Sequence, residues 1–421
     1  MRCERLGPGE APARIAARIR ALVPNSQSVS EAVAEIIAQV RAHGDTAVRE
    51  YTRQFDSHGA EPGPIAVRDA ELEAAARQLD PNVRTGLKRA IANVRRVAEA
   101  GLTKERTVDF GGHRVMLREA PVRRAGIYVP GGRAPYPSTV VMGVVTARVA
   151  GVGEVVVCAP PNVEGHLDPT VLAACRLTGA WSVFCMGGAQ AVAALAYGTE
   201  TVPAVDVLVG PGNLYVQEAK RQVFGQVAID GFAGPTDLMV IASSGARPEL
   251  VALDLLAQCE HGAGTLVVAV SEQPELLDEV ETIVREAGDT GAVAALVAID
   301  RYDGALELAE EFAPEHLQLM GAEAEELASR ISRAGCLFVG GSSASAFGDY
   351  ITGSNHVLPT AGAARFASAL SPSHFRRRFS EVRVDGGAGE LAGFAAPVAR
   401  AEGFELHARS MEARVRENGS K

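Results

Sequence analysis

Paired cysteines are missing from this sequence. Its six cysteines are scattered, none of them in a Cys-x-x-Cys arrangement. Several lie in apolar segments, where a buried thiol behaves as a small hydrophobic group. We therefore expect neither a disulfide framework nor a metal held by cysteine.

Long apolar runs and an excess of positive charge are missing as well. No stretch reaches the roughly 18 apolar residues that a membrane span needs, and the segment MRCERLGPGEAPARIAARIRALVP lacks the apolar core of a signal peptide. The net charge of -10 offers no general attraction for nucleic acid or anionic membranes. These absences predict a cytoplasmic protein with neither partner.

The sequence does contain ample apolar side chain, 47% of its residues, with 22% charged. This composition excludes global disorder. At 421 residues the chain is too long for one ordinary hydrophobic core. We expect several packed units.

Short β-rich runs alternate with helical patterns from Gly126 onward, as in GIYVP, EVVVCAPP, SVFCMGG and VDVLVGPGN. After the segment GFAGP a second series begins at DLMVIAS and ends at CLFVGG. Such alternation predicts βαβ units around parallel sheets that are buried on both faces. The predicted fold class is therefore α/β, with two Rossmann-like units whose parallel sheets are flanked by helices.

The remaining segments have helical periodicity. Roughly the first 120 residues are expected to pack onto the second sheet, and the last fifty resemble an arm more than a domain. The predicted division is an N-terminal helical arm (1–27), a larger α/β domain (28–125 and 237–370), a second α/β domain (126–236) and a C-terminal helical arm (371–421).

Glycine-rich loops follow three strands of the first series, at Gly131-Gly132, Gly187-Gly188-Ala189-Gln190 and Gly210-Pro211-Gly212-Asn213. Ligands of open parallel sheets bind outside the carboxyl ends of strands, and glycine lets a flat cofactor approach the backbone. None of the loops has the G-x-G-x-x-G pattern. A nucleotide site and ordinary turn chemistry both remain open.

The second series holds the ionisable side chains. Gln258 and His261 have i, i+3 spacing at a helix end, which suits two ligands of one metal but also a histidine that caps the helix. Asp349 and His356 follow a strand near the same sheet edge, although Asp349 could equally be a helix N-cap. Imidazole, carboxylate and amide oxygen together would suit zinc with open positions.

Glu315 and His316 lie just after a helix that ends before Pro314. An acid beside an imidazole places two proton-transfer groups on one loop. A solvated turn is the alternative. His407 would by itself be interpreted as a surface histidine of a helix.

Nine motifs together resemble the histidinol dehydrogenase family, in the family's order, from about residue 25 to 415. The motifs are YVPGG, APYPST, GGAQAVAALAYGTE, VGPGNLYVQEAKRQVFG, AGPTD, QCEH, APEHL, GDYITGSNHVLPT and ELHARS. The resemblance implies zinc-dependent, NAD-linked, four-electron oxidation of L-histidinol to L-histidine through bound histidinal, the last step of histidine biosynthesis.

The resemblance also implies a role for individual residues. One zinc per subunit would be held by Gln258, His261, Asp349 and His407, with His407 supplied by the other subunit of a homodimer. Glu315 and His316 would transfer protons. Substrate would also contact Thr236, His316, Glu402 and the zinc ligands.

By the same resemblance the unit 126–236 would bind NAD, with Tyr128, Gln190 and Asn213 lining the site. The larger domain would carry the zinc and the proton-transfer residues. The arm 371–421 would form the dimer.

Several positions depart from the family's usual pattern. Thr236-Asp237 stands where Ser-Glu is common, Gly143 stands where Asn is expected, and Gly262-Ala263-Gly264 follows His261. The additional methyl group of Thr236 could reshape the substrate pocket. An alternative is therefore a paralogue acting on another amino alcohol or a sulfonated polyol, although Glu402 could pair with a substrate ammonium and favours histidinol. A non-catalytic protein is disfavoured because all matched ligands are retained. Preference for NAD over NADP and the role of Arg376 to Arg378 stay open.

Overall fold

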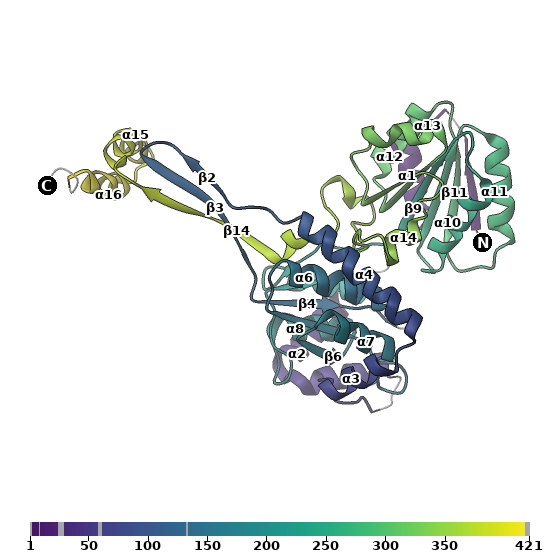
Figure 1. Cartoon of the computed structure of the whole chain (residues 1–421), viewed down its shortest axis with the longest axis horizontal. Helices are drawn as coiled ribbons and strands as arrows, with labels where there is room; N and C mark the ends of the chain where they lie inside the picture. The colour runs from purple at the N-terminus through teal and green to yellow at the C-terminus, as the bar shows by residue number, and fades with distance from the viewer. Residues whose placement is uncertain (1, 8, 24–28, 58–60, 132–133, 417–421) are drawn as a thin grey trace. The chain divides into compact units, whose positions relative to one another are not determined.

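The computed structural model describes residues 2–7, 9–23, 29–57, 61–131 and 134–416. The chain forms two compact units, the first of residues 1–101 and 122–375 and the second of 102–121 and 376–421. Figure 1 traces both along the chain. Gly132 and the expected boundary between residues 27 and 28 lie outside the described residues.

A five-stranded parallel sheet organises residues 124–229, in the order β6-β5-β4-β7-β8. Its strands are β4 (Arg124–Tyr128), β5 (Glu154–Ala159), β6 (Ser182–Cys185), β7 (Val207–Val209) and β8 (Ala228–Ile229). The helices between them are α5 (Pro137–Val140), a π-helical stretch (Val141–Val145), α6 (Thr146–Val149), α7 (Pro169–Thr178), α8 (Gly188–Tyr197) and α9 (Leu214–Val223).

Neighbouring residues of one strand enter different cores of this sheet. Val155 and Val157 join one cluster of buried side chains, whereas Val156 and Cys158 join the other. Side chains alternate between the faces of a strand, so both faces are buried. This explains the nearly continuous apolar runs of the sequence.

A six-stranded parallel sheet follows, in the order β1-β11-β10-β9-β12-β13. Its strands are β1 (Arg2–Leu6), β9 (Asp237–Ala242), β10 (Leu266–Ser271), β11 (Val293–Ala298), β12 (His316–Met320) and β13 (Cys336–Val339). Its helices are α1 (Pro12–Ala21), α10 (Pro248–Cys259), α11 (Pro274–Glu286), α12 (Tyr302–Phe312), α13 (Ala322–Glu325) and α14 (Ser345–Tyr350). The two parallel sheets confirm the predicted α/β class.

The N-terminal segments pack differently from the prediction. Helix α2 (Ser30–Tyr51) contacts α8 and α9, α3 (Asp69–Gln78) contacts α7, and α4 (Pro81–Ala100) contacts α6, so these helices cover the five-stranded sheet. The expected packing on the second sheet is therefore corrected. Residues 2–6 are also not helical, because β1 pairs with β11 at the edge of the six-stranded sheet.

The second unit contains strand as well as helix. Strands β2 (Arg106–Asp109), β3 (His113–Pro121) and β14 (Arg376–Val384) form an antiparallel sheet, followed by α15 (Ala388–Ala401) and α16 (Glu405–Arg416). The helices α15 and α16 pack on each other. Arg376 and Arg378 both form ion pairs with Glu119 of β3. At least part of the basic run therefore joins two strands.

In the described part of the chain no helix is both long and apolar enough to span a membrane. All six cysteines lie in that part and are free thiols.

Candidate functional site

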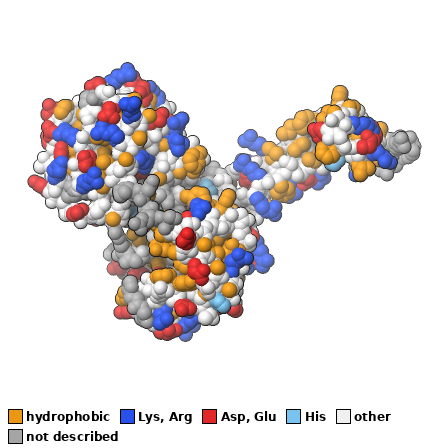
Figure 2. Space-filling view, turned by 180° about the vertical axis from the view of Figure 1, so that it is seen from behind, with side chains coloured by type: hydrophobic (Ala, Val, Ile, Leu, Met, Phe, Trp, Pro, Cys, Tyr) orange, Lys and Arg blue, Asp and Glu red, His pale blue; other side chains and the backbone are white. Residues whose placement is uncertain are grey.

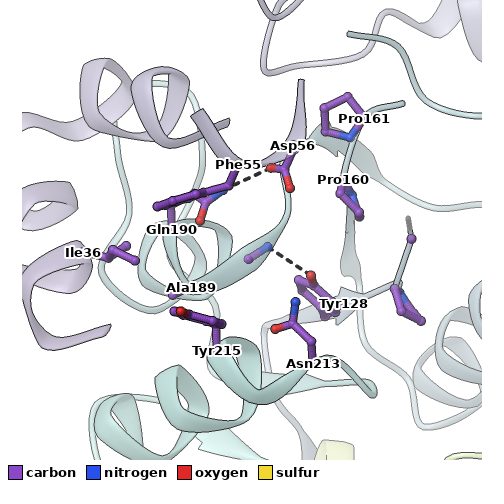
Figure 3. Close-up of a pocket in the computed structure, with 13 residues that line it drawn as sticks. Ile36, Phe55, Asp56, Tyr128, Pro160, Pro161, Ala189, Gln190, Asn213 and Tyr215 are labelled. Atoms are coloured by element: carbon purple, nitrogen blue, oxygen red, sulfur yellow. Dashed lines mark hydrogen bonds between the residues drawn. The ribbon is translucent and has the colours of Figure 1, made fainter. Parts of the chain in front are cut away.

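A cavity of about 450 Å³ opens at the carboxyl ends of β4 and β7, where the order of the five-stranded sheet reverses direction. Such a reversal leaves a crevice between the loops of a parallel sheet. Figure 3 shows the lining residues, which come from the end of β4, from the loops and helix starts that follow β4, β5, β6 and β7, from α2 and from the π-helical turn after α2. They are Ile36, Phe55, Asp56, Tyr128, Pro130, Gly131, Pro160, Pro161, Gly188, Ala189, Gln190, Asn213 and Tyr215.

The three residues assigned to NAD by resemblance, Tyr128, Gln190 and Asn213, all line this cavity. The Gly188 N–H donates to the Tyr128 hydroxyl at 3.0 Å, and Gln190 Nε2 donates to Asp56 Oδ2 at 3.1 Å. Asn213 caps α9. The arrangement combines aromatic and proline surfaces with a few fixed polar groups, which is typical of a small-molecule site.

Asp56 was not found from the sequence. It ends the π-helical turn that follows α2, and burial raises the pKa of its carboxyl group to about 6. Because it lies more than 130 residues from Gln190, its partner, only the tertiary fold brings the two together.

A buried ion pair fixes the glycine-rich loop after β7. The Lys220 ammonium donates to the Gly210 carbonyl at 3.0 Å and pairs with Asp230, whose Oδ2 accepts the Gly210 N–H at 2.8 Å. Gly210 has φ +121°, and a Cβ there would lie 2.1 Å from the Tyr128 carbonyl oxygen. Only glycine allows this loop to approach the end of β4 so closely.

A second polar cluster lies at the amino ends of β9 and β12 in the six-stranded sheet. Thr236 precedes β9, and Glu315 and His316 stand at the start of β12. The carboxyl-end rule that was applied to the glycine-rich loops of the first series does not describe this cluster. Glu315 and His316 are 6% and 3% exposed, which also excludes the solvated turn.

A chain of hydrogen bonds runs through this cluster. Gln258 Nε2 donates to Thr236 Oγ1 at 2.6 Å, and Thr236 Oγ1 donates to Glu315 Oε2 at 2.5 Å. The Asp237 N–H donates to the same carboxylate oxygen at 3.1 Å. Burial raises the pKa of Glu315 to about 7, although these two donors oppose the shift.

His316 is oriented by the backbone of β9. Its Nδ1 lies 3.2 Å from the Asp237 carbonyl oxygen, which can only accept, so Nδ1 carries the hydrogen. The buried Nε2 has no hydrogen-bond partner in the part of the chain that the structure describes and lies 3.6 Å from Asp349 Oδ1. Burial lowers the pKa of His316, but the negative charges of Glu315 and Asp349 outweigh it and raise the value to about 9.

Asp349 stands at the end of α14 rather than at its N-cap, which is Ala344, so the N-cap alternative is excluded. The charges of His316, His356 and His261 lower the pKa of its carboxyl group, although burial opposes them. His356 donates through Nδ1 to the Asp349 carbonyl at 2.9 Å. The charges of three imidazoles thus act on one carboxylate.

The four zinc ligands implied by resemblance divide between the two units. Gln258 is buried in the last turn of α10, and His261 follows the end of that helix. His407 and Glu402 belong to the second unit, where both are exposed. Among the described residues, no three His, Cys, Asp or Glu side chains gather in a metal-binding arrangement.

The unexpected Gly143 also has a local cause. It lies in the π-helical stretch, where a Cβ would come 2.4 Å from Ile127 Cγ2. Asn355 donates to the Met142 carbonyl and to Thr146 Oγ1 in the same stretch. The glycine therefore allows the stretch to pack against β4.

Comparison with known proteins agrees with this architecture. The histidinol dehydrogenase family model matches residues 21–415. This chain belongs to the histidinol dehydrogenase family. It is therefore an oxidoreductase enzyme, and the family implies the last step of histidine biosynthesis.

Two relatives of the family illustrate the similarity. The chain is 44% identical to a histidinol dehydrogenase of Parasynechococcus marenigrum, over 89% of each chain. It is 43% identical to one of Haloarcula marismortui, over 89% of this chain and 91% of the relative. The solved structure of histidinol dehydrogenase from Elizabethkingia anophelis matches 99% of both chains with a TM-score of 0.91 at 28% identity.

Proposed function

We propose that this member of the histidinol dehydrogenase family oxidises L-histidinol to L-histidine through bound histidinal, with zinc and NAD. The observation that supports this most directly is the buried pair of Glu315 and His316, whose Nε2 carries no hydrogen-bond partner among the described residues. Zinc held by Asp349 would offset the negative charge that raises the pKa of His316, so that the imidazole would be neutral and its Nε2 could accept a proton. NAD accepts a hydride in each of two oxidations, and zinc orients the substrate.

The chain's own residues then perform proton transfers. His316 Nε2 takes the hydroxyl proton of the alcohol as hydride leaves the same carbon, which gives the aldehyde. Glu315 takes a proton from water as the water oxygen adds to the aldehyde carbon, while protonated His316 returns its proton to the aldehyde oxygen, which gives the hydrate and leaves His316 neutral again. His316 takes a hydroxyl proton of the hydrate as the second hydride leaves, which gives the carboxylic acid.

The residues of the first unit suit zinc. His261 supplies an imidazole, Asp349 a carboxylate, and Gln258 an amide oxygen, since its nitrogen already donates to Thr236. Zinc accepts all three ligand types. Helix α10 also ends at Cys259, between Gln258 and His261, and the carbonyl end of a helix favours a cation.

The cavity at β4 and β7 suits NAD. The cavity has a volume of about 450 Å³, and its lining includes the aromatic ring of Tyr128, the amide of Gln190 and the N-cap residue Asn213. Gly188 and Asn213 stand at the N-termini of two ten-residue helices, where backbone N–H groups favour phosphate.

A homodimer would complete the site with His407 and Glu402 of the partner subunit. Large apolar side chains are exposed along the second unit, and Figure 2 shows them as orange groups among its charged residues. They include Val108, Phe110, Leu117, Phe379, Val382, Val384, Phe394, Val398, Phe404 and Leu406. Exposed apolar surface of this extent is typical of a protein interface.

The six free thiols further support a reducing compartment such as the cytoplasm.

The decisive assay uses purified protein with zinc, NAD and L-histidinol, and measures NADH and product together. Two NADH per histidine formed would support the proposal. Turnover confined to another amino alcohol or a sulfonated polyol would support the alternative that Thr236 and Asp237 raise. No turnover of any alcohol by the zinc-loaded protein would contradict both.

The shared site has its own test. Mixed subunits of His407→Ala and His316→Ala should regain part of the activity, because one site then receives wild-type residues from both chains. Mixing His316→Ala with Glu315→Ala is the control, since neither site of that pair is intact. Equal activity of the two mixtures, after proven subunit exchange, would contradict a site shared through His407.

A further inference from the structure

Arg20 of α1 reaches the segment that precedes β12. Its Nη1 donates to Asp237 Oδ2 at 2.6 Å, and its Nη2 donates to the Phe312 carbonyl at 2.8 Å. The guanidinium also stacks 3.7 Å above the centroid of the Phe312 ring. A planar cation with several donors can make all three contacts at once.

Asp237 connects this cation to the proton-transfer pair. Its side chain is fully buried, and its Oδ1 accepts the Glu315 N–H at 2.7 Å. Its backbone N–H donates to the Glu315 carboxylate, and its carbonyl accepts from His316 Nδ1. One residue therefore fixes the Glu315 backbone, the Glu315 carboxylate and the His316 ring.

The segment held in this way is strained. Ala313 has φ +48°, in the left-handed region that is unfavourable for a residue with a Cβ. Arg20 binds the residue before Ala313, and Asp237 binds Glu315 two residues after it. The Arg20–Asp237 pair thus bridges the two ends of the strained turn.

We propose that Arg20 and Asp237 form a positioning pair that holds Glu315 and His316 in the geometry they need for proton transfer. The inference rests on the proposed function for its catalytic part. Neither residue takes part in the chemistry. Without Arg20 the buried Asp237 carboxylate loses its cation, and because an uncompensated buried charge is strongly destabilising, the side chain should leave its present position. The Glu315 backbone then loses its acceptor and the turn relaxes.

The test compares Arg20→Met and Arg20→Lys with Arg18→Met. Arg18 lies on the same helix but, among the described residues, pairs only with Glu10 at the surface, which makes it a matched control. For Arg20→Met we expect kcat to fall about tenfold or more, because small displacements of catalytic groups are costly. The KM values for NAD and histidinol should stay unchanged. Arg20→Lys keeps the positive charge but lacks the planar guanidinium group, so its kcat should lie between those of Arg20→Met and wild type.

Hydrogen exchange of residues 312–317 gives a readout that does not need activity. The Glu315 amide should exchange faster in Arg20→Met than in wild type, and at the wild-type rate in Arg18→Met. Unchanged exchange and unchanged kcat in the Arg20 variants would overturn the inference, as would an equal loss in Arg18→Met. Should Arg20→Met fail to fold, Arg20→Lys decides by the same two measurements. If the wild-type protein is inactive, only the proposed function is refuted. Hydrogen exchange would still test whether the Arg20–Asp237 pair holds Glu315 and His316 in place.

Discussion

Replacing Thr236 by valine removes one hydroxyl group and leaves the shape of the side chain nearly unchanged. The hydroxyl donates to Glu315 at 2.5 Å and accepts from Gln258 at 2.6 Å. A hydrogen bond to a charged group contributes about 1.5–3 kcal/mol. Because this bond favours the ionised carboxylate, its loss should disfavour ionisation of Glu315 by roughly 10- to 100-fold.

The assay is the pH dependence of kcat/KM for histidinal oxidation, the step in which Glu315 must be ionised. Burial already raises the pKa of Glu315 to about 7. In Thr236→Val the acidic limb of the profile should move to higher pH, and kcat/KM below that limb should fall by the factor given above. Thr236→Ser is the matched control, because it keeps the hydroxyl and should keep the wild-type profile. If the pH profiles of kcat/KM coincide for Thr236→Val and Thr236→Ser, the hydroxyl of Thr236 does not control the ionisation of Glu315.

Three further outcomes are expected. Gly143→Ala should destabilise the protein by about 1–3 kcal/mol in thermal unfolding, because the new Cβ meets Ile127, whereas an unchanged Tm would exclude the tight packing. Lys220→Met should cost about 3–5 kcal/mol in denaturant unfolding, since it leaves Asp230 buried without its cation; a loss below 1 kcal/mol would argue against that pair. The folded pKa of Glu315 lies above its ordinary value of 4.5, so its contribution to stability is complete below pH 4.5 and is lost as pH rises through about 7. Glu315→Gln should remove this part of the pH dependence, and an identical pH dependence in wild type and variant would contradict it.

Much of the fold follows from local patterns. Strands buried on both faces are apolar along nearly their whole length, and residues 155–159 of β5 and 266–270 of β10 follow this rule. The amphipathic pattern of α2 shows that one face is buried, but it carries no information about which sheet covers that face. The polar strand β1 has no apolar run at all, because it lies at a sheet edge.

The site was predictable in residue type more than in position. Adjacent Glu315 and His316 suggested proton transfer, and the structure brings Thr236, Gln258 and Asp349 around them. Their location at the amino ends of the strands could not be predicted, since the general rule for parallel sheets concerns the opposite edge. The roles of the residues as zinc ligands stay a prediction.

The pairing of β3 with β14 has a consequence for biosynthesis. Arg118 and Glu381, which form an ion pair across these strands, are 263 residues apart in the chain. During translation β3 therefore leaves the ribosome long before its partner exists. Contacts between such distant residues form slowly, and an unpaired strand can pair with another chain in the meantime. Most of the chain must therefore be synthesised before β3 and β14 can pair.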